Sequence, residues 1–210
     1  LESLGIHIIY GQSKENITGD IDFVVYTAAI HPDNPEFKAA KELGLPMMER
    51  AEMVGQVMKN YQNAIAISGT HGKTTTTSMV SHIFLEAQKD PTISVGGILK
   101  VIDGNIRVGH SQDFITEACE YTNSFLKFHP TAGSILNIDA DHLDFFKDIN
   151  DIRHSFRRFA ELIPEHGALI VNGEIPDLAE ITKGLACQVI TFGLTSDCDY
   201  FADNISFDEH

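Results

Sequence analysis

The sequence lacks several features that would place it outside the ordinary globular proteins. No apolar run approaches the ~18 to 20 residues of a membrane-spanning helix, and no secretory signal segment is recognisable, so we expect a soluble protein. The three cysteines, Cys119, Cys187 and Cys198, form no C-x-x-C pair. A reduced, cytoplasmic setting is the simplest interpretation of this cysteine usage.

Basic residues are also scarce. Lys and Arg number 15 against 30 Asp and Glu, which gives a formal net charge of −15. Such a charge argues against non-specific binding to nucleic acid or to an anionic membrane. A phosphate ligand would therefore have to be bound by local positive groups and by Mg²⁺. No pattern in the sequence indicates an oligomeric state.

Residues 64–80 carry the clearest motif, a short apolar segment followed by a glycine-flanked turn, a lysine and four threonines. Residues 64–67 are typical of a buried strand. The apolar side chains Met79, Val80, Ile83, Phe84 and Ala87 share one helical face, so the turn lies where a helix begins. Free N–H groups and the positive dipole end at a helix start favour bound phosphate.

Each residue type in this turn suits a nucleotide. Glycines let the backbone approach closely, Lys73 can reach the terminal phosphates, and the Thr74 hydroxyl is placed to ligate Mg²⁺. Ile67 occupies the position of the first glycine in the common G-x-x-x-x-G-K-[ST] loop, which is a departure in spacing. The alternative, an ordinary strand-to-helix turn with a surface lysine, is disfavoured because every other part is present. The predicted ATP-binding residues are Gly69, Thr70, His71, Gly72, Lys73, Thr74 and Thr75.

The first part of the chain, residues 1–60, alternates short strands and helices and predicts a partial Rossmann-like domain with a parallel sheet. We predict strands at 6–10 and 21–27 and helices at 34–43 and 50–58, with Pro35 in a first helical turn. This part is too short for a complete doubly wound domain. We therefore expect an earlier strand and a glycine-rich loop to precede residue 1.

The second part, residues 61–210, is predicted to be a P-loop-type α/β domain with the phosphate turn after its first strand. Further strands are predicted at 92–95, 113–118, 133–138, 168–171 and 188–192, and helices at 72–87, 149–162 and 175–183. Residues 108–112 are expected to form an exposed turn. Another extended segment is expected to begin at Tyr200.

Polar clusters follow two of these strands. Glu117 and Glu120 end one strand, and Asn137 and His142 follow the next. Because the carboxyl ends of parallel strands meet at one edge of a sheet, the clusters could share a crevice with the lysine loop and hold Mg²⁺ there. Taken alone, Glu117 is a weak signal. The ordinary alternative for His142 is a helix-entry histidine paired with a neighbouring aspartate.

Taken together, three segments resemble the Mur ligase family. They are G-T-H-G-K-T-T-T at 69–76, E-A-C-E-Y at 117–121 and N-I-D-A-D-H at 137–142, with further likeness at 33–36 and 49–53. The resemblance implies an ATP-driven ligation in which a substrate carboxylate attacks the γ-phosphate to give an acyl phosphate, and an amine then displaces phosphate. Within the family, the chain is most similar to the members that add L-alanine to UDP-N-acetylmuramate in peptidoglycan precursor synthesis.

The resemblance also implies residue roles. Lys73 would hold β and γ oxygens, Thr74 and Glu117 a first Mg²⁺, and His142 a second. Catalysis would thus fall to Lys73, Glu117 and His142, and substrate binding to His71, Glu120 and Asn137. Residues 121–123 read Tyr-Thr-Asn where many relatives carry acidic and serine residues, which weakens the transfer of roles there.

Other readings stay open at this point. A murein-peptide recycling ligase of the same family differs in its acceptor amine, which the family's C-terminal domain selects, and that domain would begin beyond residue 210. Residues 149–161 contain no lysine, whereas ligases that add later amino acids carry a carbamylated one there. A non-catalytic nucleotide-binding module has little need of two metal positions. Without the C-terminal ligase domain, we expect the chain alone to be inactive.

Overall fold

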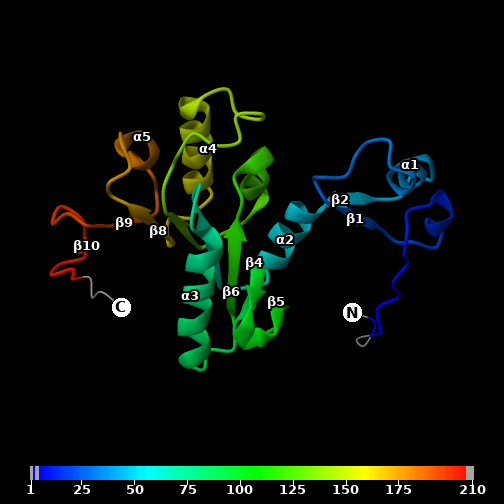
Figure 1. The fold of residues 1–210 in the computed structure, drawn as a ribbon, viewed down its shortest axis with the longest axis horizontal. Helices are drawn as coiled ribbons and strands as arrows, with labels where there is room; N and C mark the ends of the chain where they lie inside the picture. The colour runs from blue at the N-terminus through cyan, green and yellow to red at the C-terminus, as the bar shows by residue number, and fades with distance from the viewer. Residues whose placement is uncertain (1, 3–4, 207–210) are drawn as a thin grey trace. The chain divides into compact units, whose positions relative to one another are not determined.

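The computed structural model describes residue 2 and residues 5–206 (Figure 1). The chain divides into two compact units, Leu1–Met53 and Val54–His210, and the helix α2 (Arg50–Met58) contains the division. Within the described residues, no helix combines the length and the apolar character needed to cross a membrane.

The first unit is built on one strand–helix–strand element. Strand β1 (Val24–Tyr26) pairs in parallel with β2 (Met47–Glu49), and α1 (Pro35–Glu42) lies between them in the chain, after the short η2 (Lys14–Asn16). Helix α1 begins where the Asn34 side chain accepts hydrogen bonds from the N–H groups of the first turn, and Pro35 occupies that turn. The ring of Tyr26 packs edge-on against Phe37, 5.2 Å between centroids, and fixes helix against strand.

The sequence-based prediction of a strand at 6–10 is wrong, because these residues are irregular in the structure. Alternating apolar residues do not make a strand without a neighbour to accept its hydrogen bonds. In the described part of this unit β1 pairs with β2 alone, and Tyr10 is 84% exposed. Strand β2 was not predicted, because Met-Met-Glu carries no β-branched residue.

The second unit contains a mixed sheet in the order β10-β9-β8-β7-β3-β6-β4-β5. All its pairings are parallel except that of β5 with β4, so the predicted parallel α/β class is confirmed. The strands are β3 (Asn63–Ser68), β4 (Thr92–Leu99), β5 (Gly104–Arg107), β6 (Asp113–Ala118), β7 (Ala132–Ile135), β8 (Ala168–Asn172), β9 (Gln188–Gly193) and β10 (Tyr200–Phe201).

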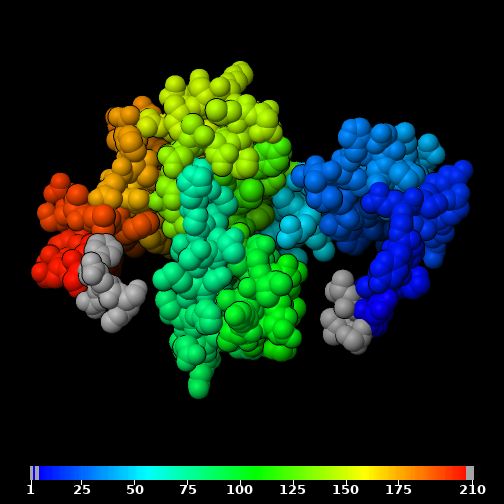
Figure 2. Space-filling view, in the orientation of Figure 1, coloured from blue at the N-terminus to red at the C-terminus, as the bar shows by residue number. Residues whose placement is uncertain are grey.

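Helices cover this sheet on both faces. Helix α3 (Lys73–Glu86) connects β3 to β4, whereas α4 (Ile149–Glu161) and α5 (Ala179–Thr182) connect strands in the opposite direction along the sheet. Right-handed crossovers therefore place α3 on one face and the other two helices on the other. Figure 2 shows α3 covering the front of the unit. The short helices η3 (Lys100–Ile102) and η4 (Tyr121–Lys127) lie in connections.

Phenylalanines form the centre of the core between α4 and η4. The Phe125 ring stacks on Phe159 at 4.9 Å and meets Phe156 edge-on at 5.5 Å, and all three side chains are fully buried. Burial of three large aromatic groups makes this one of the firmest parts of the fold. It anchors η4, which follows the Glu117 strand directly.

Several predicted elements differ in detail. Helix α3 begins directly after the turn, as predicted from its apolar face. The fully buried side chains of α3 are Thr77 and Ser81, whereas Met79 and Ile83 on the apolar face are 61% and 65% exposed. The predicted helix at 175–183 is helical only from Ala179, since Asp177 has a left-handed backbone with φ of 53°. Strand β7 ends at Ile135, earlier than the predicted 138, and the next two residues bond the segment after β3: the Leu136 N–H donates to the Ser68 carbonyl, and the Asn137 carbonyl accepts from the Thr70 N–H.

Candidate nucleotide-binding and catalytic site

The loop after β3 is packed too closely for a side chain at Gly69. Its φ is +139°, and a Cβ there would lie 3.0 Å from the Leu136 Cβ and 3.2 Å from the Asn137 nitrogen. Gly72 is also left-handed, and it begins α3 without a side-chain cap. The first turn of α3 thus keeps N–H groups that a phosphate can satisfy, as the sequence motif requires.

The Lys73 side chain curls back over its own loop. Its ammonium donates to the Gly69 carbonyl at 2.6 Å, to the Thr70 carbonyl at 3.1 Å and to the Glu120 carboxylate at 2.9 Å. The Lys73 side chain is 15% exposed and that of Glu120 only 2%. A cation is therefore fixed beside the helix start, where phosphate oxygens would compete for it with the carboxylate.

A second pair lies beside it. The Thr74 hydroxyl donates to Glu117 Oε2 at 3.1 Å, and the Gly96 N–H donates to Glu117 Oε1 at 2.6 Å. Hydroxyl and carboxylate oxygens in contact are ligands of the kind that Mg²⁺ prefers. The structure thus brings Thr74 and Glu117 together from α3 and β6.

Gly96 is a site residue that sequence reasoning missed. A Cβ at this position would lie 2.7 Å from Glu117 Oε2, so a larger residue would push the carboxylate out of its present place. The signal that could have found it is the Gly96-Gly97 pair directly after the predicted strand at 92–95, because glycine within a strand often marks a close approach of another group.

Asn137 and His71 hold the lysine loop to the end of β7. The His71 N–H donates to Asn137 Oδ1 at 2.7 Å, and Asn137 Nδ2 donates back to the His71 carbonyl at 3.0 Å. The His71 imidazole itself is 64% exposed and lies 3.6 Å from Asp139. The backbone contact is therefore structural, while the ring stays accessible to a ligand.

His142 completes the group. Its Nε2 lies 3.8 Å from Glu120 Oε1, and its ring faces that of Tyr121, 4.6 Å between centroids. Asp141 accepts from the His142 backbone N–H, and the Tyr121 hydroxyl donates to Asp144 at 2.9 Å. This hydrogen bond to the Asp144 carboxylate raises the pKa of the Tyr121 phenol. The imidazole thus faces Glu120 and Tyr121, while Asp141 bonds the His142 backbone and Asp144 bonds the Tyr121 hydroxyl.

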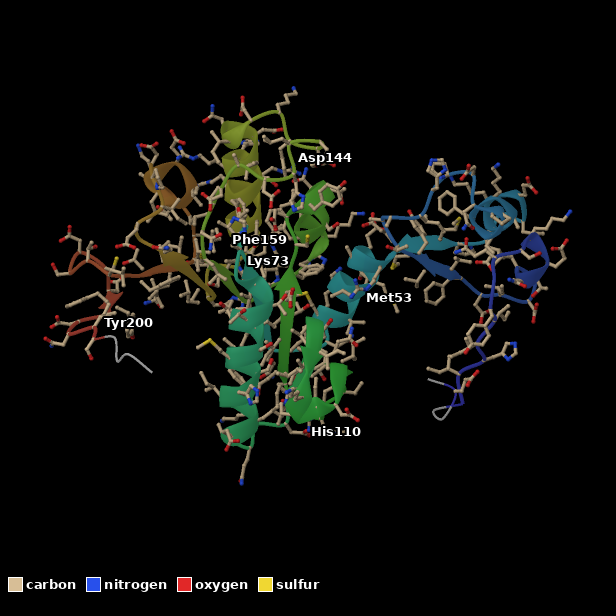
Figure 3. The ribbon with its side chains drawn as sticks, in the orientation of Figure 1. Met53, Lys73, His110, Asp144, Phe159 and Tyr200 are labelled. Carbon is tan, nitrogen blue, oxygen red and sulfur yellow. The ribbon has the colours of Figure 1, made fainter. Side chains whose placement is uncertain are left out.

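The predicted site residues therefore fall into two contact groups at one end of the sheet. Lys73, Glu120 and His142 form one, and Thr74 and Glu117 form the other, while Thr75 lies exposed on the first turn of α3. Figure 3 shows Lys73 and Asp144 toward this end and His110 at the opposite end. In the part of the chain that the structure describes, no three His, Cys, Asp or Glu side chains converge into a ready metal site. Metal binding here would need additional oxygens from hydroxyl, water or phosphate.

Comparison with known proteins identifies the family. The model described as Mur ligase middle domain matches residues 67–210, and the one described as Mur ligase family, catalytic domain, matches residues 1–62. The UDP-N-acetylmuramate–L-alanine ligase of Agathobacter rectalis is 62% identical over 209 residues, covering 100% of this chain and 46% of the relative. That of Lachnospira eligens is 63% identical over 199 residues, covering 94% and 43%.

Solved structures agree with this assignment. UDP-N-acetylmuramate-alanine ligase MurC of Thermotoga maritima matches with a TM-score of 0.76 at 30% identity, covering 91% of this chain and 43% of that one. A murein peptide ligase of Psychrobacter arcticus shares the fold, with a TM-score of 0.83 at 22% identity over 99% of this chain and 48% of that one. The chain spans less than half the length of the curated relatives named above. The sequence motifs, the fold and the family models together show that this chain belongs to the Mur ligase family.

Proposed function

We propose that the ligase of which this chain forms part joins L-alanine to UDP-N-acetylmuramate with hydrolysis of ATP to ADP and phosphate. The observation that carries the proposal is the pair of contact groups, Lys73 with Glu120 and His142, and Thr74 with Glu117, in a chain so similar to such ligases. Residues 1–60 would belong to the UDP-sugar-binding domain and residues 61–210 to the ATP-binding domain. The setting that we propose is the cytoplasm, in keeping with three free cysteines.

In this proposal the loop and Lys73 bind the nucleotide. The N–H groups at the start of α3, together with Gly69, Thr70, Gly72 and Thr75, would surround the phosphates, and Lys73 would exchange its loop carbonyls for β and γ oxygens. The carboxylate of UDP-N-acetylmuramate then attacks the γ-phosphorus and ADP leaves. The amine of L-alanine attacks the resulting acyl phosphate and displaces phosphate.

Metal binding divides between the two contact groups. Thr74 and Glu117 would hold one Mg²⁺ and His142 a second, and such ions supply charge neutralisation on the transferring group. No protein nucleophile is needed, because the substrate carboxylate attacks directly. The exposed ring of His71 would face the nucleotide sugar, and Asn137 would serve that side of the site by holding the His71 backbone. Glu120 would act on the substrate through Lys73 and His142, since its own side chain is almost fully buried.

Phosphate release tests the proposal. The full-length ligase with ATP, Mg²⁺, UDP-N-acetylmuramate and L-alanine should turn over, and the 210-residue chain should not. In the full-length ligase, Lys73→Ala should lower kcat by roughly 10³-fold or more, because positive charge on the transferring group is lost. Lys89→Ala, beyond the far end of α3, is the matched control and should leave turnover unchanged. Unchanged activity in Lys73→Ala would contradict the proposal.

A second candidate is the recycling of murein peptides, which the shared fold with murein peptide ligases supports. The two functions differ only in the acceptor amine. Comparing L-alanine with an L-alanine-headed tripeptide as acceptor decides between them. A higher kcat/KM with the tripeptide than with L-alanine would favour recycling.

A further inference from the structure

Tyr121 has no part in the proposed reaction, although three side chains contact it. Its ring lies 4.6 Å from the His142 ring with 35° between their planes, and 6.1 Å from Phe145, which meets it edge-on. Its hydroxyl donates to Asp144 at 2.9 Å. Tyr121 therefore contacts both His142 and a residue two positions further along the same loop.

The segment that carries Tyr121 is held firmly. Thr122 and Asn123 have left-handed backbones, with φ of 54° and 58°, a conformation that costs free energy for non-glycine residues. The Asn123 side chain accepts a hydrogen bond from Ser155 on α4, and its N–H donates to the Glu120 carbonyl at 2.9 Å. Phe125, four residues after Tyr121, is fully buried and anchors the segment in the core. The backbone that follows Tyr121 is thus anchored to the core, while Tyr121 itself is 38% exposed.

The loop that carries His142 has less support of its own. His142 is left-handed, with φ of 53°, and its carbonyl accepts from the N–H groups of Phe145 and Phe146 at 2.9 Å each. These bonds fix the backbone turn, but they leave the imidazole free to rotate about its side-chain torsions. Two groups restrain the ring, Glu120 at 3.8 Å from Nε2 and Tyr121 on its face.

We propose that Tyr121 is a positioning residue, whose ring holds the His142 imidazole toward Glu120 and so sets the affinity of His142 for a divalent cation, with the hydroxyl bond to Asp144 as a secondary restraint. The effect on cation affinity rests on the proposed function, whereas the placement of the His142 ring rests only on the contacts described above. An imidazole without Tyr121 samples several rotamers, and only a fraction of them can bind the ion, so the apparent affinity falls by that fraction.

A first experiment tests the ring contact without any ligand. In NMR spectra of the 210-residue chain, the ring current of Tyr121 should shift the His142 imidazole protons upfield. Tyr121→Ala should abolish this shift and Tyr121→Phe should retain it, because phenylalanine keeps an aromatic ring beside the imidazole. Tyr200→Ala, which removes a 70% exposed tyrosine elsewhere, is the matched control. Unchanged His142 resonances in Tyr121→Ala would overturn the proposal.

A second experiment tests the consequence. Binding of Mn²⁺ in the presence of ATP, followed by electron paramagnetic resonance on the full-length ligase, should weaken about threefold to tenfold in Tyr121→Ala, the range that one aromatic contact supports. Tyr121→Phe should restore most of the affinity, and the KM for L-alanine should stay unchanged. Normal Mn²⁺ binding in Tyr121→Ala, despite the loss of the NMR shift, would show that the rings are in contact but that Tyr121 does not position His142, and would overturn the proposal. If the wild-type ligase forms no product while the NMR shift is present, the proposed function fails and the ring contact stands.

Discussion

The two ends of the strands in the second unit use polar groups in different ways. At the amino ends polar side chains tie connections to strands, as where the Thr92 hydroxyl accepts from the Gly109 N–H and from the Tyr61 hydroxyl at 2.9 Å each. The ion pair there, Arg107 with Asp90, is partly exposed, with side chains 30% and 42% accessible. At the carboxyl ends a lysine and a glutamate are buried together, and His142 is held in a left-handed conformation. A buried ion pair is a poor source of stability. The difference indicates that one end of the sheet maintains the fold and the other serves binding.

The largest effect that would sharpen this comparison comes from two acids on one strand, β6. In the full-length ligase, Glu117→Gln should lower kcat/KM for ATP by about 10²- to 10³-fold, since an oxygen ligand loses its charge at the transferring group. The unfolding midpoint should hardly move. Asp113→Asn, at the amino end of the same strand, weakens the acceptor that the Asn63 side chain bonds at 2.7 Å. This variant should lower the unfolding midpoint and leave kcat/KM for ATP almost unchanged. Equal losses of activity in both variants would remove the distinction between the two ends.

Part of the binding end of the sheet could be predicted from the sequence, and part depends on packing. The lysine loop and Glu117 were recognisable because their residue types stand at fixed spacing after apolar strands, and strand ends converge in any parallel sheet. The burial of Glu120 and the closeness of Gly96 to Glu117 depend on how β4 and η4 pack beside β6, which local patterns do not contain.

The errors of the sequence reading have a similar cause. Residues 6–10 have the composition of a strand, but pairing depends on a neighbour that composition does not reveal. Strand β5 was not predicted because Gly-Asn-Ile-Arg has little strand preference, and its antiparallel pairing with β4 supplies the order instead. Tertiary contacts therefore decided the elements for which local preference was weak.

A smaller effect is expected at the amino end for Thr92→Val. Thr92 is 6% exposed. Loss of its hydroxyl leaves the Gly109 N–H and the Tyr61 hydroxyl without their shared acceptor. The free energy of unfolding should fall by about 1 to 3 kcal/mol, the cost of leaving buried donors unsatisfied. Urea unfolding of the 210-residue chain measures this, with Thr75→Val, on the exposed first turn of α3, as the control. A stability loss in the control as large as that in Thr92→Val would contradict the assignment.

The smallest effect concerns Asp90, also at the amino end. Hydrogen bonds from the Arg107 guanidinium and then from the His110 N–H hold the pKa of the Asp90 carboxyl below its usual value. Because the folded pKa is the lower one, the carboxylate stabilises the fold above the unfolded pKa of about 4, and this contribution is lost as the pH falls through the folded pKa. Asp90→Asn should tolerate the left-handed backbone at this position, where φ is 54°. The stability difference between wild type and Asp90→Asn, measured by urea unfolding, should therefore be constant from about pH 6 to 8 and shrink below about pH 4. A difference that stays constant down to the lowest pH would show that the Asp90 contacts do not depend on its charge.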